Sequence, residues 1–167
     1  MDIIGLNGYS QVGKDTAAFH LTTGRGYTRF AFADEIRDHL TEMNPFMDGV
    51  TSLAAVAEKH GSLEAALGDR IYGGEIGRLR TAFLDLHAET FSTPGTDEQL
   101  IAWDPLLGGT TTLVDLVEKY DSDWDKIKHD RIFGTESRRS MQRYGTEAIR
   151  EHVSMDAWVT LLEQRIR

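Results

Sequence analysis

Residues 8–16, which read GYSQVGKDT, carry the strongest chemical signal in the chain. Gly8, Gly13 and Lys14 have the spacing of a phosphate-binding loop, in which backbone N–H groups turn inward around a phosphate. The following helix would add the positive end of its dipole, and Lys14 a mobile charge at the β- and γ-phosphates. The residues expected to hold ATP are Gly8, Tyr9, Ser10, Gln11, Val12, Gly13, Lys14, Asp15 and Thr16. The alternative is a glycine-rich turn between a strand and a helix.

The loop departs from the usual pattern at its metal position. A Ser or Thr normally follows the lysine, and its hydroxyl coordinates Mg²⁺. Here Asp15 follows Lys14, and Thr16 comes next. A carboxylate is a hard oxygen ligand for Mg²⁺, and so is a hydroxyl, so the spacing leaves both Asp15 and Thr16 as candidate ligands.

The elements around this loop predict an α/β fold. Residues 2–6 form a short apolar run typical of a buried strand, and residues 14–21 have helical spacing, with Gly24 and Gly26 beyond them. Residues 27–33 (YTRFAFA) favour a second strand, and residues 34–43 an amphipathic helix. We expect a P-loop kinase-like domain with a small parallel sheet. Such a sheet needs a third strand, which could lie within 81–103, for example at 100–103. The alternative is a shortened fold without that strand.

The rest of the chain is predominantly helical and contains an internal repeat. Residues 45–60 match residues 105–120 at a constant offset of 60. After one extra residue, the segment 69–73 (DRIYG) matches 130–134 (DRIFG), and Arg78 matches Arg139. We interpret this as a duplicated helix–turn–helix unit within a single domain, 1–167, with a helical insertion or duplication around 60–103. The alternative is a chance likeness between helices.

Three segments together resemble the bacteriophage-type deoxynucleoside monophosphate kinases. They are the loop ending in residues 13–16 (GKDT), residues 30–34 (FAFAD) with Arg37 after them, and residues 138–147 (RRSMQRYGTE). Residues 156–159 (DAWV) also fit, so the likeness spans residues 3 to about 160. The Arg-Arg-x-x-Gln-x-x-Gly-Thr pattern is its most specific part.

The resemblance implies phosphoryl transfer from ATP to a deoxynucleoside monophosphate, with Mg²⁺. It places Lys14, Arg138 and Arg139 at the transferring phosphoryl group, and Asp34, Arg37 and Gln142 at the nucleotide. Arginine forks match phosphate oxygens, and an amide suits the edge of a base. It also implies phage-encoded deoxynucleotide metabolism in the host cytoplasm.

Each of these side chains also has a plainer interpretation. Asp34 could cap the helix that follows it, and the three arginines could be solvated helix charges. Gln142 could be a surface residue. Trp158 fits a core position better than a ligand contact. The six histidines have no metal-ligand spacing, so we expect no zinc site.

The family normally continues beyond its tryptophan-containing helix into at least one more strand, which ends in an Asp-x-Arg segment. No such strand follows residues 156–166 here, which favours a second hypothesis. In it, the chain is a catalytically impaired derivative that acts as a nucleotide-binding or protein-interaction module. A missing neighbour would leave an open edge at residues 2–6, and such an edge could form a homodimer.

Composition narrows the possible partners. The 167 residues carry a formal charge of −9, a sign that repels nucleic acid and argues against broad nucleic-acid binding. Residues 110–131 can be read as a DNA-binding helix–turn–helix, but they lack a basic face. We expect no membrane segment, because no apolar run is long enough to span a bilayer. There is no cysteine, and the chain is expected to be cytoplasmic.

Overall fold

The computed structural model describes residues 4, 6 and 13–166. The sequence predicts one domain, and the contacts group the chain into two compact units, Met1–Ala31 and Phe32–Arg167. About 64% of the chain is helical. Among the described helices, none combines the length and the hydrophobicity that crossing a membrane would require.

The described part of the first unit is built around α1 (Lys14–Arg25). Gly13 precedes the helix with a φ of 83°, a conformation that glycine adopts without steric cost. At the other end Gly26, with a φ of 70°, donates its N–H to the carbonyl of Leu21. The predicted helix is confirmed, and it runs through Gly24 to Arg25.

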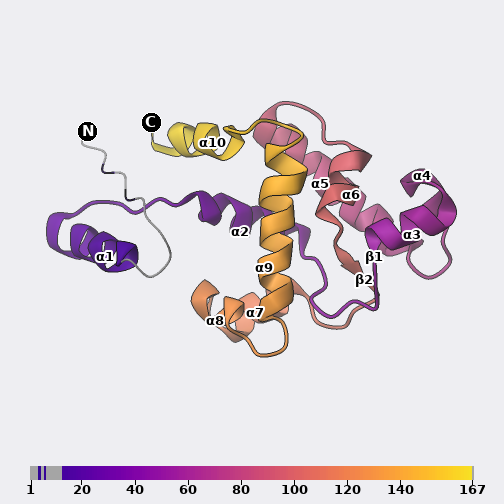
Figure 1. The fold of residues 1–167 in the computed structure, drawn as a ribbon, viewed down its shortest axis with the longest axis horizontal. Coiled ribbons are helices and arrows are strands. Elements are labelled where there is room, and N and C mark those ends of the chain that lie inside the picture. Colours follow the sequence, from indigo (N-terminus) through magenta and orange to yellow (C-terminus); the bar gives the residue numbers. More distant parts are fainter. Residues whose placement is uncertain (1–3, 5, 7–12, 167) are drawn as a thin grey trace. The chain divides into compact units, whose positions relative to one another are not determined.

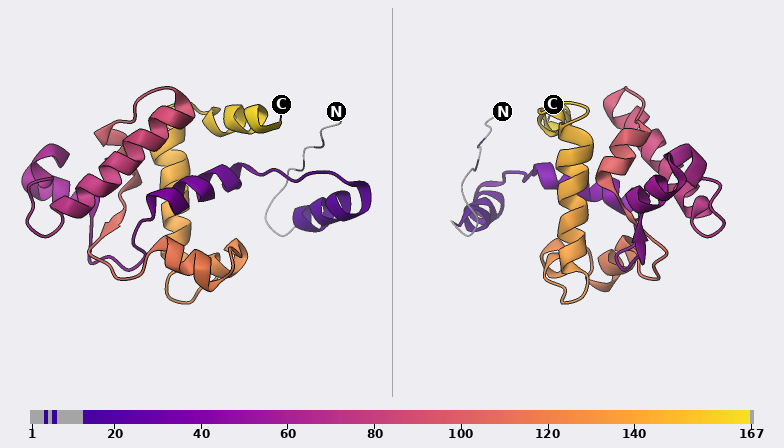
Figure 2. Two further views of the ribbon diagram at one scale, coloured as in Figure 1. Left: turned by 180° about the vertical axis from the view of Figure 1, so that it is seen from behind. Right: turned by 45° about the vertical axis from the view of Figure 1, so that its right-hand side comes forward.

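The second unit is an assembly of short helices around two long ones (Figure 1). Its elements are α2 (Phe32–Met43), β1 (Thr51–Ser52), α3 (Leu53–His60), α4 (Leu63–Ala66), α5 (Gly73–Phe91), α6 (Asp97–Trp103), β2 (Leu106–Leu107), α7 (Leu113–Lys119), α8 (Trp124–Lys128), α9 (Gly134–Gln142), the π-helix η1 (Arg143–Arg150) and α10 (Ala157–Ile166). Helix α9 continues directly into η1, and α2 contacts α5, α7, α9 and α10 (Figure 2).

The predicted parallel sheet is wrong. Within the described residues the only sheet is the antiparallel pair of β1 and β2, two residues each. Residues 27–31 form no strand, and α2 begins at Phe32 because Ile36, Leu40 and Met43 give that stretch a helical apolar face. Residues 100–103 belong to α6, which a capping box at Thr96 and Gln99 starts.

The strand predicted at residues 2–6 falls mostly outside the described residues. Ile4 and Leu6 are described, and both are exposed and belong to no strand. The homodimer expected through this edge therefore stays a prediction, which the mass of the protein in solution would test.

Contacts exchanged between the two repeat copies are reciprocal. The amide of Leu53 donates to the carbonyl of Pro105 at 3.0 Å, and the equivalent amide of Leu113 donates to Pro45 at 2.9 Å. Phe46 and its equivalent Leu106 bridge each other across the junction. The copies thus meet as the two halves of an isologous dimer would, on equivalent surfaces.

The residue just before each repeat copy, Asn44 or Asp104, makes an equivalent contact with the other copy. Asn44 and Asp104 have φ values of 47° and 52°, and each binds a backbone amide in the first turn of the other copy's first helix. The Asn44 side chain accepts from the amide of Val114 at 2.9 Å, and that of Asp104 accepts from Ala54 at 2.8 Å. These bonds supplement the N-caps of α3 and α7, which are Ser52 and Thr112.

A second pair of equivalent acids starts the long helices. The Asp69 carboxylate accepts from the amides of Ile71 and Tyr72, and Asp130 accepts from Ile132 and Phe133. The bond from the Tyr72 amide is the largest influence holding the pKa of Asp69 well below its usual range. The hydroxyl of Tyr120 does the same to the pKa of Asp130. Equivalent aspartates therefore bind the amides that precede α5 in the first copy and α9 in the second.

Gly73, the first residue of α5, is expected to tolerate no side chain. A Cβ there would lie 2.3 Å from the carbonyl oxygen of Leu67, whereas a Cβ on Gly74 would meet nothing within 4 Å. Gly73→Ala should lower the free energy of unfolding by about 1–3 kcal/mol, because backbone must move. Gly74→Ala, the matched control, should raise it by about 0.5–1 kcal/mol through helix propensity. Urea unfolding of both variants checks this, and equal effects would contradict the close approach.

The core of the second unit is aromatic. Phe83, Trp103 and Tyr144 are essentially fully buried, and the indole N–H of Trp103 donates to the Ser140 hydroxyl at 3.0 Å. The segment expected to be an insertion, 60–103, contributes Phe83 and Trp103, so it forms part of this core. Both long helices, α5 and the α9–η1 helix, are anchored to it.

Candidate functional site

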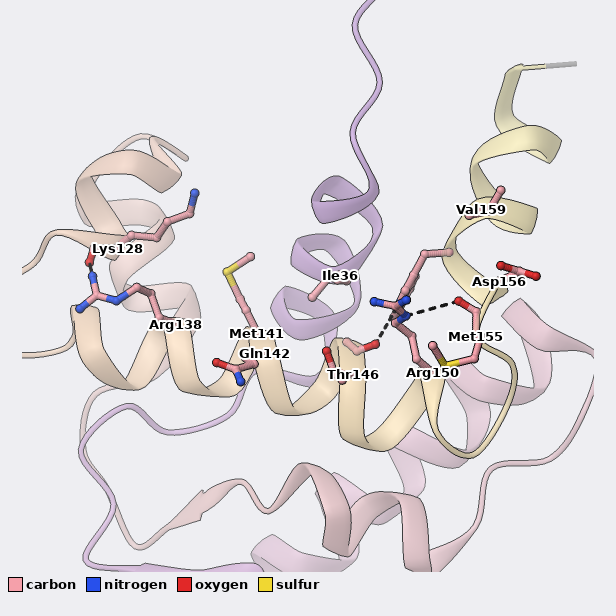
Figure 3. Close-up of a pocket in the computed structure, with 12 residues that line it drawn as sticks. Ile36, Lys128, Arg138, Met141, Gln142, Thr146, Arg150, Met155, Asp156 and Val159 are labelled. Carbon is pink, nitrogen blue, oxygen red and sulfur yellow. Dashed lines mark hydrogen bonds between the residues drawn. The ribbon is translucent and has the colours of Figure 1, made fainter. Parts of the chain in front are cut away.

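A pocket of about 490 Å³ runs along the exposed face of α9 and η1 (Figure 3). All of its lining belongs to the second unit and comes from α2, α8, α9, η1, the segment that joins η1 to α10, and the start of α10. The lining residues are Ile36, Lys128, Arg138, Met141, Gln142, Gly145, Thr146, Arg150, Met155, Asp156, Trp158 and Val159. Two of the predicted site residues, Arg138 and Gln142, are among them.

One end of the pocket is cationic. Lys128 closes α8 there, and the Arg138 guanidinium donates from Nη1 to the Lys128 carbonyl (Figure 3). The Lys128 ammonium lies 3.5 Å from the exposed carboxylate of Asp125, an ion pair that solvent weakens. Two positive side chains therefore share this end, an arrangement suited to a phosphate group.

The middle of the pocket is polar on one side and apolar on the other. Gln142 and Thr146 follow Arg138 along the helix at intervals of four residues, while Ile36 and Met141 supply apolar surface. Gly145 allows α2 to approach, because a Cβ there would lie 2.7 Å from Cδ1 of Ile36. A flat ring would find apolar contacts here together with an amide and a hydroxyl.

The far end is closed by α10. The indole N–H of Trp158 donates to the carbonyl of Gly145 at 2.8 Å, and the ring packs on His39, Phe91 and Tyr144. Trp158 is 5% exposed, so it is a core residue, as the sequence favoured, that also borders the pocket. Arg150 lies at this end and donates from Nε to the carbonyl of Met155 at 3.3 Å.

The π-helical geometry is confined to the second copy. Residues 82–89, which lie at the same offset of 61 from η1, belong to the α-helix α5. In η1 the amide of Glu151 reaches back to the carbonyl of Thr146 at 3.1 Å, five residues earlier. Wide turns of this kind are frequent at functional sites. Here the wide turn carries Gly145, Thr146 and Arg150, all of which line the pocket.

Comparison of the two copies separates pocket residues from scaffold residues. The sequence match between the copies ends at Arg78 and Arg139; at the same offset of 61, the residues that stand against Arg138, Gln142, Thr146 and Arg150 are Gly77, Thr81, Asp85 and Glu89. The contacts between copies are retained, while the charges on this helix face differ. The pocket chemistry therefore belongs to the second copy alone.

Arg139, predicted to act beside Arg138, lies outside the pocket lining. Its guanidinium binds both carboxylate oxygens of Glu136, at 2.7 and 2.8 Å, and the carbonyl of Asp104 at 3.1 Å. Its equivalent Arg78 binds the carbonyl of Asn44 at 3.3 Å. The bonds to Glu136 are the main cause that raises the pKa of Arg139. These contacts support a structural role for Arg139. Its predicted catalytic role stays a prediction.

Asp34 and Arg37 also lie outside the pocket lining, although Ile36 between them is part of it. Their side chains form an ion pair of 2.9 Å, and the Arg37 guanidinium lies 5.5 Å from the ring centre of Trp124. Because α2 begins at Phe32, Asp34 sits in the first turn rather than at the capping position. A direct contact of this pair with a nucleotide stays a prediction.

The predicted ATP-binding loop is only partly described. Residues 8–12 lie outside the described residues, and so does the side chain of Asp15. Lys14 begins α1 directly after Gly13, and Thr16 is exposed in the first turn. Among the described residues, no group of three or more potential ligands could hold a metal ion.

Sequence reasoning missed Lys128 and Arg150 as pocket residues. Arg150 could have been found, because it continues the four-residue spacing of Arg138, Gln142 and Thr146. Lys128 lies ten residues before Arg138 and gave no such signal, since only the packing of α8 on α9 brings it to the site.

Trp158→Phe is expected to weaken the closure of the pocket by α10. The substitution keeps an aromatic ring and leaves the Gly145 carbonyl without its donor, at a cost of about 1–3 kcal/mol. The melting temperature should fall by about 2–12 °C, and amides of α10 should exchange faster. Trp124→Phe is the matched control. The face of the Trp124 ring lies against the Arg37 guanidinium, and a phenylalanine ring keeps such a face. An equal loss of stability in both would remove the indole bond as the cause.

Comparisons of the chain with protein-family models, with curated proteins and with solved structures found no match.

Proposed function

We propose that this protein transfers a phosphoryl group from ATP to a deoxynucleoside monophosphate bound in the pocket. The observation that carries the proposal is the order of side chains along α9 and η1. A cationic end leads into a middle that is polar on one side and apolar on the other, with α8 and α2 adding Lys128 and Ile36 to the side chains of α9 and η1. A nucleoside monophosphate presents the same order, with its phosphate, its sugar and base edges, and its flat ring.

The acceptor phosphate would lie between Lys128 and Arg138. It is already anionic, so its oxygen needs no strong general base to attack the γ-phosphorus of ATP. The work left to the protein is alignment and neutralisation of charge in the transition state. Arg138 is suited to both, since a guanidinium binds two phosphate oxygens at once and its carbonyl contact with Lys128 orients it.

The donor side of the proposal is supported by the sequence of residues 8–16. Lys14 would bind the β- and γ-phosphates, and the exposed hydroxyl of Thr16 in the first turn of α1 suits a magnesium ligand. When bound, Mg²⁺ would neutralise charge on the transferred phosphoryl group. Asp15 is the other candidate ligand.

Turnover decides between this proposal and a nucleotide-binding protein without activity. The full chain would be incubated with ATP, Mg²⁺ and each deoxynucleoside monophosphate, and ADP and the diphosphate product would be measured. ADP formed in proportion to product supports the transfer. Monophosphate binding without any ADP would favour the binding module, and a chain that neither binds nor turns over would overturn the proposal.

Lys14→Ala in the same assay tests the donor side. It should abolish turnover and leave monophosphate binding unchanged, since Lys14 is not among the residues that line the pocket. Arg25→Ala, at the last residue of α1, is the matched control and should keep full activity. Unchanged turnover in Lys14→Ala would exclude the glycine loop from the reaction.

A further inference from the structure

A backbone carbonyl holds the guanidinium at the cationic end of the pocket. Nη1 of Arg138 donates to the carbonyl oxygen of Lys128 (Figure 3). Lys128 is the last residue of α8, and Arg138 lies in the second turn of α9, so this bond joins the two helices. Both side chains line the pocket. Their shared place in it therefore depends on how closely α8 approaches the start of α9.

Gly134, the buried first residue of α9, permits that approach. A Cβ on Gly134 would lie 2.5 Å from the carbonyl oxygen of Lys128 and 2.9 Å from its carbonyl carbon. A side chain cannot come so close to backbone, so any residue larger than glycine would displace the carbonyl of Lys128. Gly134 and Arg138 are four residues apart on one face of the helix, and both meet this same carbonyl.

The turn between α8 and α9 brings Gly134 back to Lys128. Oδ1 of Asp130 accepts from the amides of Ile132 and Phe133, at 2.8 and 2.9 Å. The amide of Gly134 donates to the carbonyl of Asp130 at 3.0 Å. These bonds lie within five consecutive residues, so the close approach of the glycine is built into the chain without a ligand.

The first repeat copy has the same close approach without a cation. A Cβ on Gly73 would lie 2.3 Å from the carbonyl oxygen of Leu67, which again belongs to the residue six positions earlier. Four residues after this glycine stands Gly77, where the matched segment of the second copy has Arg138. The close approach therefore belongs to the scaffold that the copies share, and an arginine uses the carbonyl in the second copy alone.

A neutral acceptor leaves the charge of Arg138 available to a ligand. The neighbouring Arg139 binds both carboxylate oxygens of Glu136, which cancels much of its charge. A carbonyl orients Arg138 without such a loss. The Asp125 carboxylate, 3.5 Å from the Lys128 ammonium, is largely exposed, so solvent weakens that pair as well. This end of the pocket therefore keeps positive charge for a phosphate.

Resting on the proposed function, we infer that Gly134 is a positioning residue for the acceptor phosphate. Its missing side chain lets the carbonyl of Lys128 accept from the Arg138 guanidinium, which keeps both cations at one end of the pocket. A larger residue at position 134 moves α8 away from the start of α9 and removes this bond. The affinity for the phosphate then falls, while the affinity for the rest of the nucleotide is retained.

Calorimetry with the full chain tests this inference by isolating the contribution of the phosphate. That contribution is the ratio of two affinities, for each deoxynucleoside monophosphate and for its nucleoside without phosphate. Gly134→Ala should lower the ratio by about ten- to a hundredfold, the effect of losing hydrogen bonds to a charged group. Gly73→Ala is the matched control, because it makes the same overlap in the copy that has Gly77 in place of the arginine. Both variants should lower the urea midpoint, and the control should keep the ratio.

A second pair of variants opens the same turns without a steric overlap, and it decides the matter if Gly134→Ala does not fold. Asp130→Ala removes the acceptor that orders the turn before Gly134, so the ratio should fall here too. Asp69→Ala removes the equivalent acceptor in the first copy and should leave the ratio unchanged.

The outcomes separate this inference from the proposed function. Equal ratios in the second-copy and first-copy variants would overturn the positioning role of Gly134 and leave the pocket as the acceptor site. A ratio near one in the unchanged chain, for all four nucleotides, would remove the phosphate from this end of the pocket, and the proposed function with it. A ratio that falls in the second-copy variants alone supports the inference, since loss of stability by itself would lower both affinities together.

Discussion

Arg138→Ala is expected to lower turnover by about three orders of magnitude while leaving the fold intact. Its guanidinium is exposed in the pocket and has one recorded contact, with the Lys128 carbonyl. A cation that acts on the transferred phosphoryl group typically contributes an effect of this size. Steady-state kinetics with saturating ATP would give the loss, and the urea midpoint should stay within experimental error.

Arg139→Ala is the matched control for this prediction, at the adjacent residue and with the same substitution. It removes the two bonds to Glu136 and the bond to the Asp104 carbonyl. We expect a loss of about 1–3 kcal/mol in the free energy of unfolding, with activity per folded molecule retained. If Arg139→Ala were the inactive variant and Arg138→Ala the unstable one, the assignment of the pocket face would be reversed.

Acid is expected to begin destabilising the helical unit above the pH range in which most carboxylates titrate. His39 and His87 are 6% and 0% exposed, and burial lowers the pKa of each from 6.5 to about 4. Between these values the unfolded chain binds protons that the folded chain does not, so stability falls as the pH drops from 6.5 to 4. Each histidine contributes about 3 kcal/mol to that loss.

The surroundings of His87 make it the better site for a test. Both of its ring nitrogens are buried without a hydrogen-bond partner among the described residues, and the ring stacks on Phe83 at 4.4 Å. His87→Leu should raise stability at pH 7 and roughly halve its slope between pH 6.5 and 4.5. Thermal unfolding followed by circular dichroism would show both effects. His20→Leu, which changes an exposed histidine, should alter neither.

His39 retains partners that His87 lacks. Its Nδ1 lies 2.9 Å from the Tyr144 hydroxyl, and its Nε2 lies 3.4 Å from the hydroxyl of Thr90. His39→Leu would leave the buried Tyr144 hydroxyl unpaired, so we expect it to destabilise the protein at neutral pH. A pH profile that is unchanged in His87→Leu would contradict the role of the buried pair.

The sequence was informative where a pattern is local. The helix beginning at Lys14 was predicted because its spacing and its glycines lie within one segment. Arg138 and Gln142 were predicted because both belong to one short sequence motif. Residues four apart lie on the same face of a helix, and both line the pocket.

Prediction failed where distant segments decide the outcome. Residues 27–33 have the composition of a strand, but a strand needs neighbours, and packing of Ile36 and Leu40 draws the end of this stretch into α2. Arg139 looked equivalent to Arg138 in the motif. Only the fold shows that one arginine faces the pocket and the other faces Glu136 and the turn at Asp104.

The reciprocal bonds between the repeat copies have a consequence for cooperativity. Ser52 and Thr112 are the N-caps of α3 and α7, and the side chains of Asp104 and Asn44 each add one bond from the other copy, to the amides of Ala54 and Val114. A local opening of one copy removes this bond from the first turn of the other, so we expect the openings of the two helix starts to be coupled. The amides of Ala54 and Val114, far apart in sequence, should therefore exchange with solvent at one common rate, set by global unfolding.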